Sequence, residues 1–269
     1  MPHPAFDLRD QTGPFDIIGD VHGCADELRL LLEQLGYSVA ANALAAGGDV
    51  TITPPAGRRL IFVGDFVDRG PRSPAVLRMA MRLCATGAAL AVAGNHDVRF
   101  VRLLKGLSTT LTHGLAETKA QMEHEPEPFH ADVRDFLEAL PYYLWLDEGK
   151  LLVAHAGIRA DMIGFQSGAV RSFCLYGETA GVTADDGLPV RYNWAARYAG
   201  DPFVVYGHTP VAAAAWQNNT VCIDTGCCYG NQLTALRWPE REIVSVPAVR
   251  AHAILRRPLG LPPDRPDGH

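Results

Sequence analysis

The sequence has no surplus of positive charge, no long apolar run and no apolar stretch near its start. Its 269 residues include 24 Lys and Arg against 30 Asp and Glu, a formal net charge of −6. Broad, sequence-independent binding to nucleic acid requires a basic face, so we expect no extended nucleic-acid-binding surface. No apolar run approaches the roughly 20 residues that cross a bilayer, and residues 1–11 lack the apolar region of a signal peptide. We therefore expect a soluble cytoplasmic protein with no membrane contact.

Paired metal-binding or redox cysteines are also missing. The six cysteines are scattered along the chain with no Cys-x-x-Cys spacing, which argues against a zinc knuckle and against a redox pair. We expect them to be reduced, buried or half-buried thiols. The sequence also contains no Cys-x₅-Arg, so a cysteine-dependent phosphatase is not supported. It contains no Gly-x₄-Gly-Lys-Ser/Thr either, so a kinase of the phosphate-binding-loop type is not supported.

What the sequence does contain is a repeated junction between an apolar strand and a polar loop. Short apolar runs closed by a small residue are typical of buried strands that end in tight loops. Five such runs are each followed by Asp, Asn or His. The five loops are Gly19–Gly23, Gly64–Gly70, Gly94–Asp97, His155–Gly157 and Gly207–Thr209.

Each of these loops has an ordinary explanation when it is considered alone. A strand-end Asp or His is more often a turn or cap residue than a ligand, and glycines commonly mark turns. Asn95 by itself is a routine turn signal, and Arg69 by itself is a surface arginine. Together, these explanations would require five unrelated coincidences in similar positions, so we reject them for the set.

Strand–helix alternation early in the chain predicts a mostly parallel sheet, in which ligands lie at the carboxyl ends of the strands. The five loops would then meet at one edge and bring six donor side chains together. These are Asp20, His22, Asp65, Asn95, His155 and His208. Carboxylates mixed with imidazoles suit manganese, iron, zinc or nickel better than calcium, and the set is too large for one structural zinc. It divides between two ions if one carboxylate bridges them, an arrangement used for phosphoryl hydrolysis.

Three further residues of the same loops would have different roles. A histidine hydrogen-bonded to a carboxylate is held in one orientation and can protonate a leaving oxygen, which suits His96 with Asp68. The guanidinium of Arg69 offers two parallel N–H groups to a phosphate. The residue types therefore indicate hydrolysis of a phosphate compound.

The strand–helix alternation is interrupted at residues 106–148, where two helices are predicted at 115–124 and 129–140. We interpret residues 1–255 as a single domain that carries a helical cap insertion at about 106–148. Residues 256–269 are rich in proline, and we expect them to form a disordered tail.

At these motifs the chain resembles the calcineurin-like metallophosphoesterase superfamily, specifically its phosphoprotein-phosphatase branch. The motifs Gly-Asp-x-His-Gly, Gly-Asp-x-Val-Asp-Arg-Gly, Gly-Asn-His-Asp, His-Ala-Gly and Gly-His span residues 19–209. The resemblance implies an α/β fold, a four-layer α/β/β/α sandwich of mixed sheets. It also implies one ion held by Asp20, His22 and Asp65, and a second held by Asp65, Asn95, His155 and His208. His96, paired with Asp68, would be the general acid, and Arg69 would contact the phosphate.

Further stretches, at 155–161, 175–181, 205–210 and 223–247, resemble two bacterial groups. One comprises stand-alone diadenosine-tetraphosphatase-like hydrolases, and the other is the phosphatase module of bacterial polynucleotide kinase-phosphatase. In these groups the residue matching Asp224 supports activity, although a strand-end turn would also explain an aspartate there. Arg159 is a candidate for phosphate binding, with a surface arginine as the alternative. Two departures from the protein phosphatases are Asp97, where Glu is common, and the lack of a clear match for their substrate arginines beyond Arg69.

The resulting hypothesis is a dimetal-dependent phosphohydrolase that uses a metal-bridging hydroxide on phosphoesters or phosphoanhydrides. The expected substrates are nucleotides or other phosphorylated small molecules, such as diadenosine tetraphosphate, or RNA-end phosphates. We expect two divalent transition-metal ions, Mn²⁺ first, with Ni²⁺, Fe or Zn²⁺ as alternatives. A serine/threonine protein phosphatase would use the same ions. A non-catalytic binding scaffold would be marked by lost ligands, and here all six are present.

Overall fold

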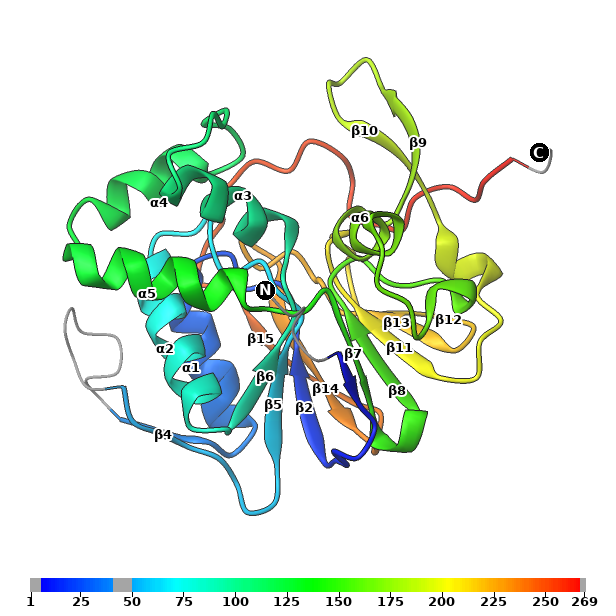
Figure 1. Ribbon diagram of the computed structural model, residues 1–269, viewed down its shortest axis with the longest axis horizontal. Helices are drawn as coiled ribbons and strands as arrows, with labels where there is room; N and C mark the ends of the chain where they lie inside the picture. Colours follow the sequence, from blue (N-terminus) through cyan, green and yellow to red (C-terminus); the bar gives the residue numbers. More distant parts are fainter. Residues whose placement is uncertain (1–5, 41–49, 267–269) are drawn as a thin grey trace.

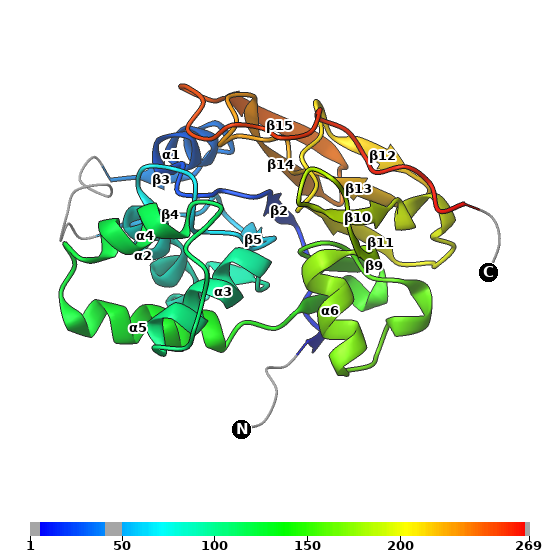
Figure 2. The same ribbon diagram turned by 90° about the horizontal axis from the view of Figure 1, so that it is seen from above.

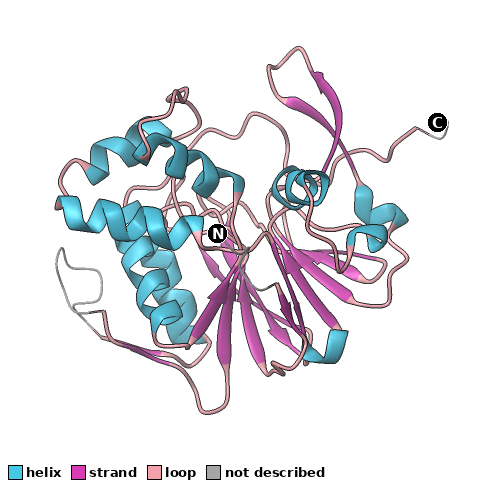
Figure 3. Ribbon diagram, in the orientation of Figure 1, coloured by secondary structure: helices cyan, strands magenta, loops and turns pink. Residues whose placement is uncertain are grey.

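The computed structural model describes residues 6–40 and 50–266, which fold into two β-sheets stacked face to face with helices on both outer sides (Figures 1 and 2). Figure 3 shows the strands gathered in the middle and the helices outside them. This confirms the four-layer α/β/β/α architecture that the resemblance implied. Within the described ranges, no helix is both long enough and apolar enough to cross a membrane.

The first sheet has five strands in the order β15-β14-β2-β5-β6. Strands β2, β5 and β6 are parallel, and β14 pairs antiparallel with both β2 and β15. The bounds are β2 (Phe15–Ile18), β5 (Arg59–Phe62), β6 (Ala89–Ala91), β14 (Gln232–Trp238) and β15 (Glu242–Pro247). Its outer face is covered by α1 (Ala25–Gln34), α2 (Ser73–Ala85), α3 (Asn95–Leu104), α4 (Leu115–Met122) and α5 (Glu127–Glu138).

The second sheet has six strands in the order β1-β7-β8-β11-β13-β12. They are β1 (Asp7–Leu8), β7 (Tyr143–Leu146), β8 (Leu151–Ala154), β11 (Phe203–Tyr206), β12 (Ala215–Gln217) and β13 (Thr220–Cys222). Helix α6 (Gly168–Tyr176) packs on its outer face with the 3₁₀ turns Ala160–Met162 and Trp194–Arg197; a third lies at Asp147–Gly149. Two small pairs complete the fold: β3 (Ser38–Val39) with β4 (Ile52–Thr53), and β9 (Glu178–Thr183) with β10 (Pro189–Tyr192).

The unbroken apolar strands follow from burial of both sheet faces. In β5, Leu60 and Phe62 join the core under the helices, whereas Ile61, and Val63 directly after the strand, join the core between the sheets. Successive side chains of a strand point to opposite faces, so a strand covered on both sides must be apolar at every position. The strands are therefore apolar throughout, and the polar side chains lie in the loops at their carboxyl ends.

The insertion contains the two helices predicted there, α4 and α5, each with ends shifted by a few residues from the expected ones. Helix α5 packs against α3 and α2, and α4 packs against α2. The insertion is therefore part of the helical layer over the first sheet, and its α4 end lies beside the strand-end loops.

Strand β13 pairs in parallel with β11 and antiparallel with β12. Residues 181–189 include the end of β9 and the start of β10. Residues 256–266, for which a disordered tail is the expectation from sequence, hydrogen-bond to the β9–β10 hairpin and to Pro210. Residues 267–269 lie outside the described part. All six cysteines are free thiols.

Candidate active site

Polar residues of the strand-end loops have an unusual backbone conformation. The φ angles are 45° for His22, 52° for Asp65, 73° for Asp68, 68° for Arg69 and 68° for His208. Left-handed φ values are uncommon for residues other than glycine. They cost on the order of 1–3 kcal/mol each and cluster at functional sites. Five such residues in loops that converge on one edge therefore mark this edge as the candidate site.

Glycines let these loops approach one another closely. A Cβ atom on Gly94 would overlap the Asp65 carboxylate, and one on Gly207 would overlap the Asp20 carboxylate. Neither position tolerates a side chain, because the carboxylate oxygen already fills the space. The glycines of the motifs therefore act here as contact surfaces for the acidic residues.

Asp65 lies between two groups of donor atoms. Its Oδ2 is 3.4 Å from His22 Nε2 on one side and 3.4 Å from His155 Nε2 on the other. Within the second group, His155 Nε2 is 2.9 Å from Asn95 Oδ1 and 2.9 Å from His208 Nδ1. The ligand atoms of Asp65, His155 and His208 all lie within 4.8 Å of one another. A carboxylate placed this way can bridge two cations.

Backbone carbonyls fix which nitrogen of two histidines carries the proton. His22 donates from Nδ1 to Val67 O (2.8 Å), and His155 donates from Nδ1 to Val63 O (3.0 Å). Burial lowers the pKa of both imidazoles, to about 3 for His155, so both rings are neutral near pH 7. Their Nε2 atoms therefore present lone pairs to the site, as the second hydrogen bond of a metal-binding histidine ensures.

The positions of these lone pairs show whether the donor atoms suit a cation. His155 Nε2 and Asn95 Oδ1, both acceptors, lie only 2.9 Å apart. His208 Nε2 is buried without a hydrogen-bond partner. Converging acceptors and an unpaired buried nitrogen are costly unless a positive charge lies between them. The residues present fit divalent transition-metal ions.

The carboxylates support the same conclusion. Burial raises the pKa of Asp20, and the nearby charges of Asp224 and Asp65 raise it further. Burial likewise raises the pKa of Asp65 and of Asp224. Asp20 also accepts the backbone N–H of His208, with distances of 3.1 and 3.2 Å to its two oxygens. Three buried acidic groups this close together require cations to remain ionised near pH 7.

His96 is hydrogen-bonded to Asp68. His96 Nδ1 lies 2.6 Å from Asp68 Oδ2. Thr118 of α4, which the sequence analysis did not identify, donates to Asp68 Oδ1 (2.8 Å) and accepts the backbone N–H of Asp68 (2.9 Å). Gly114, at the start of the same helix, packs directly on the backbone of Arg69. The insertion thus supports this loop, and the only sequence signal for Thr118 was its place in the cap.

Asp97 ties two of the loops together in spite of its short side chain. Its carboxylate accepts backbone N–H groups from Asp65 (2.8 Å), Phe66 (2.9 Å) and Gly94 (3.0 Å). The departure from the glutamate of the protein phosphatases therefore leaves a carboxylate that still holds the Asp65 loop against the Asn95 loop.

The two predicted arginines have different positions. The guanidinium of Arg69 contacts His22 Nε2, lies 2.9 Å from His96 Nε2 and sits 5.3 Å over the ring of Tyr229. Arg159 is exposed and instead pairs with Asp161, with 2.7 Å between Nη2 and Oδ2. The structure therefore brings Arg69 to the donor cluster and leaves Arg159 at the surface.

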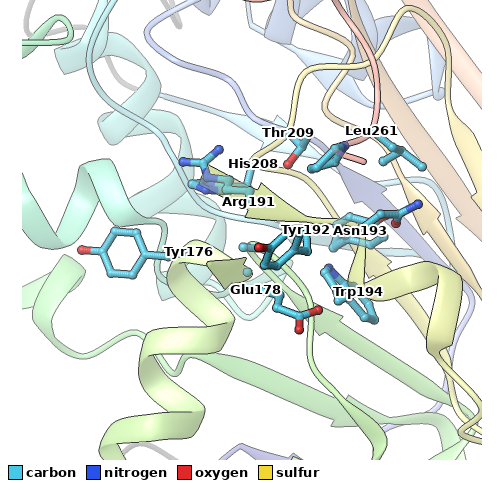
Figure 4. Close-up of a pocket in the computed structure, with 13 residues that line it drawn as sticks. Tyr176, Glu178, Arg191, Tyr192, Asn193, Trp194, His208, Thr209 and Leu261 are labelled. Atoms are coloured by element: carbon cyan, nitrogen blue, oxygen red, sulfur yellow. The ribbon is translucent and has the colours of Figure 1, made fainter. Parts of the chain in front are cut away.

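Arg191 of β10 is a site residue that the sequence analysis missed. It lines a pocket with His208 and Thr209, and Figure 4 shows its guanidinium beside His208. Its Nε is buried without a hydrogen-bond partner. Burial lowers the pKa of Arg191, as do the positive charges of Arg257 and Arg69. A guanidinium whose buried Nε has no hydrogen-bond partner, next to the donor cluster, is suited to bind an anion.

The comparisons with known proteins identify the family of the chain. A sequence model of the calcineurin-like phosphoesterase family matches residues 13–245. The chain therefore belongs to this family and is a metallophosphoesterase, a hydrolase of a dimetal-dependent family.

Two relatives carry the same name. The asymmetrical bis(5'-nucleosyl)-tetraphosphatase PrpE of Anoxybacillus flavithermus is 48% identical over 238 residues, which cover 87% of this chain and 94% of that protein. The protein of the same name from Bacillus subtilis is 44% identical over 238 residues, with the same coverage of 87% and 94%. The chain thus matches these relatives over nearly their whole length.

Solved structures show the same fold. One, of a protein to which diadenosine tetraphosphatase activity is provisionally assigned, has a TM-score of 0.62 at 28% identity and covers 91% of this chain and 98% of that chain. A protein serine/threonine phosphatase from Saccharomyces cerevisiae has a TM-score of 0.58 at 12% identity and covers 95% of this chain and 86% of that chain. At 12% identity the likeness concerns the fold alone.

Proposed function

We propose that the chain hydrolyses bis(5'-nucleosyl) tetraphosphates, cleaving one phosphoanhydride bond so that the four phosphates are divided unequally. The observation that carries the proposal is the 48% identity to a tetraphosphatase with this named activity, over 87% of the chain. The buried site of carboxylates, imidazoles and two arginines suits a polyphosphate, because the arginines offset the negative charge of the substrate.

The two ions of the proposal would be held by the residues predicted from the sequence. Asp20, His22 and Asp65 would hold one ion, and Asp65, Asn95, His155 and His208 would hold the other. Mn²⁺ is proposed first, because mixed carboxylate and imidazole donors suit borderline ions. Such ions, when bound, polarise phosphoryl oxygens and lower the pKa of water, which supplies the nucleophile.

A side chain of the protein would protonate the leaving oxygen. His96, fixed through Nδ1 by Asp68, points its Nε2 toward Arg69. Burial and the charge of Arg69 lower the pKa of His96. A phosphate anion bound at Arg69 would offset that charge and favour the protonated imidazole. His96 would then donate its Nε2 proton to the oxygen released as the P–O bond breaks.

The two arginines would bind phosphoryl oxygens from opposite sides of the donor cluster. Arg69 lies on the His22 and His96 side, and Arg191 lies on the His208 side. Asp224 is buried beside Asp20, a proposed ligand of the first ion. It would act through the carboxylate of Asp20 rather than on the substrate. Arg159 would become a substrate contact only if a long substrate extended beyond the cluster.

The test is a substrate panel with the purified protein reconstituted in turn with Mn²⁺, Ni²⁺ and Mg²⁺. Diadenosine tetraphosphate, a phosphoserine peptide and RNA with a terminal phosphate are compared, and products are separated by anion-exchange chromatography. We expect ATP and AMP in equal amounts from the tetraphosphate, with the highest kcat/KM of the panel. Two molecules of ADP would contradict asymmetric cleavage. Preference for the peptide would favour a protein phosphatase, and preference for RNA would favour an RNA-end phosphatase.

A further inference from the structure

The hairpin that carries Arg191 has little support of its own. Strands β9 and β10 form a separate two-stranded sheet, and the hairpin projects from the molecule near α6 (Figure 1). An isolated two-stranded hairpin is at best marginally stable in water. The pairing also shifts register between Pro189 and Arg191, and such an irregularity re-aims a side chain. The direction of Arg191 therefore depends on what holds the hairpin.

The C-terminal segment Arg256–Arg265, which we call the strap, holds the tip of the hairpin. Arg257 donates to both carboxylate oxygens of Asp186, at 2.5 and 2.7 Å. The same guanidinium donates to the carbonyl oxygens of Leu188 (3.3 Å) and Pro189 (3.1 Å). An exposed ion pair alone contributes little to stability. A bidentate pair combined with two hydrogen bonds to carbonyl oxygens fixes the geometry of the turn.

The strap also holds the base of the hairpin. The carbonyl of Pro263 accepts the backbone N–H of Asn193 (2.9 Å), directly after β10. The side-chain amide of Asn193 donates to Asp264 (3.1 Å). Arg265 donates to Glu178, the first residue of β9 (3.2 Å). Both ends of the hairpin are thus attached to one segment.

Between these two attachments the strap reaches the active site. Gly260 donates its N–H to the carbonyl of Pro210 (2.9 Å), two residues after His208. Leu261 and Pro262 line the same pocket as Arg191 and His208, and Figure 4 shows Leu261 at the edge of this pocket. The strap therefore connects the hairpin to the loop that presents His208.

The strap lies beyond the part of the chain that the family model matches. That match ends at residue 245, ahead of the whole strap. The strap is an element of this chain for which the family match gives no role.

We propose that the strap Arg256–Arg265 positions Arg191, by fixing the β9–β10 hairpin to the His208 loop so that the guanidinium faces the substrate phosphates. The proposal rests on the proposed function for its substrate. Loss of the strap contacts would weaken binding of the phosphate chain while the donor cluster and His96 stay in place. The effect would therefore fall mainly on KM rather than on kcat.

The experiment compares charge reversals at the tip of the hairpin. Asp186→Arg and Arg257→Asp each break the pair, and the double exchange restores it with the charges swapped. Arg134→Asp is the matched control, because Arg134 pairs with Asp135 on the exposed face of α5. Each variant is also made in an Arg191→Ala background. KM and kcat for diadenosine tetraphosphate and for p-nitrophenyl phosphate are measured, together with amide hydrogen exchange of residues 178–192.

We expect each single reversal to raise KM for the tetraphosphate about tenfold, the factor that 1.4 kcal/mol represents, and to speed amide exchange in the hairpin. The double exchange should restore both. In the Arg191→Ala background the reversals should add nothing to KM. Unchanged exchange, an unchanged KM or an additive effect with Arg191→Ala would each overturn the proposal. Activity toward p-nitrophenyl phosphate without tetraphosphate cleavage would refute only the substrate assignment, and the strap would then be judged on the generic ester and on hydrogen exchange.

Discussion

Thr118 holds Asp68 at two points: its hydroxyl donates to Asp68 Oδ1 at 2.8 Å, and its Oγ1 accepts the backbone N–H of Asp68 at 2.9 Å. Thr118 lies on α4 of the insertion, 50 residues further along the chain than Asp68. Both residues are fully buried. The cap insertion is therefore joined to the residue that orients His96. Removal of the insertion should impair protonation of the leaving group.

The variant Thr118→Val keeps the shape of the side chain and removes both hydrogen bonds. Leaving buried groups of Asp68 unpaired costs about 1–3 kcal/mol, so we expect kcat to fall roughly tenfold or more with little change in KM. Steady-state kinetics on diadenosine tetraphosphate would measure this. Thr118→Ser, which keeps the hydroxyl, is the control and should retain most of the activity. Equal kcat values for the Val and Ser variants would contradict a positioning role for Thr118.

The substitution Asp68→Asn should reveal the general-acid role of His96. Loss of the carboxylate that orients and charges the imidazole should lower kcat by about 10²–10⁴-fold for a substrate with a poor leaving group. The loss should be much smaller for p-nitrophenyl phosphate, because nitrophenolate leaves without protonation. Comparing the two substrates gives the measurement. A similar loss on both would show that Asp68 serves a different purpose.

The substitution Asp65→Asn should disrupt both ion sites at once, because Asp65 lies between the two donor groups. We expect Mn²⁺ affinity, measured by isothermal titration calorimetry, to fall by more than about 100-fold, since even outer-shell changes cost 10–100-fold. Asp161→Asn, on the surface next to Arg159, is the matched control and should bind Mn²⁺ as the unaltered protein does. Unchanged affinity in Asp65→Asn would remove the basis for the dimetal assignment.

Arg159 was a phosphate-binding candidate from the sequence, whereas Arg191 was identified only from the structure. The two arginines therefore allow a direct comparison. Arg191→Ala should raise KM for the tetraphosphate by about tenfold or more, because hydrogen bonds to charged groups contribute about 1.5–3 kcal/mol. Arg159→Ala should change kcat/KM by less than about threefold, as expected for a surface substitution. Michaelis–Menten analysis of both variants decides the point. A larger effect from Arg159 would mean that the substrate extends over the surface near α6.

Gly157 offers a test of packing next to His155. Its φ is +105°, and an added Cβ would overlap the ring of Trp194. Gly157→Ala should therefore lower the melting temperature by several degrees, at about 2–4 °C for each kcal/mol of lost stability. Gly87→Ala is the control, because Gly87 also has a positive φ of +73° but no heavy atom within 4 Å of the added Cβ. Equal shifts in both variants would indicate backbone strain alone, without a contribution from the contact with Trp194.

The donor cluster could be predicted from the sequence because its information is local. Asp20, Asp65 and Asn95 follow parallel strands of the first sheet, which end at a common edge. His155 and His208 follow parallel strands of the second sheet. Asp20, Asp65 and Asn95 were therefore placed together without knowledge of any long-range contact. Strand–helix alternation predicted a mostly parallel sheet early in the chain, and the apolar runs reflect burial of both strand faces. The four-layer sandwich itself was implied by the family resemblance.

Arg191, Thr118 and the strap could not be predicted because each depends on contacts between distant segments. Thr118 lies on a short helix whose sequence shows only solvated charges around it. Arg191 belongs to a hairpin that carries none of the strand-end motifs. The strap was expected to be a disordered tail from its prolines, and its hydrogen bonds to the hairpin join residues far apart in the sequence.

The first sheet has a consequence for when the enzyme can become active during its synthesis. Strand β14 lies directly beside β2, and the carbonyl of Thr234 accepts the N–H of Gly19, next to Asp20. A ribosome-bound chain that stops before residue 232 therefore has the first ligands and the β2–β5 pairing, but it lacks the strand on the other side of β2. All six donors have then been translated, yet ion binding should reach full strength only after β14 has left the exit tunnel. A strand translated after every donor thus decides when the first motif becomes functional.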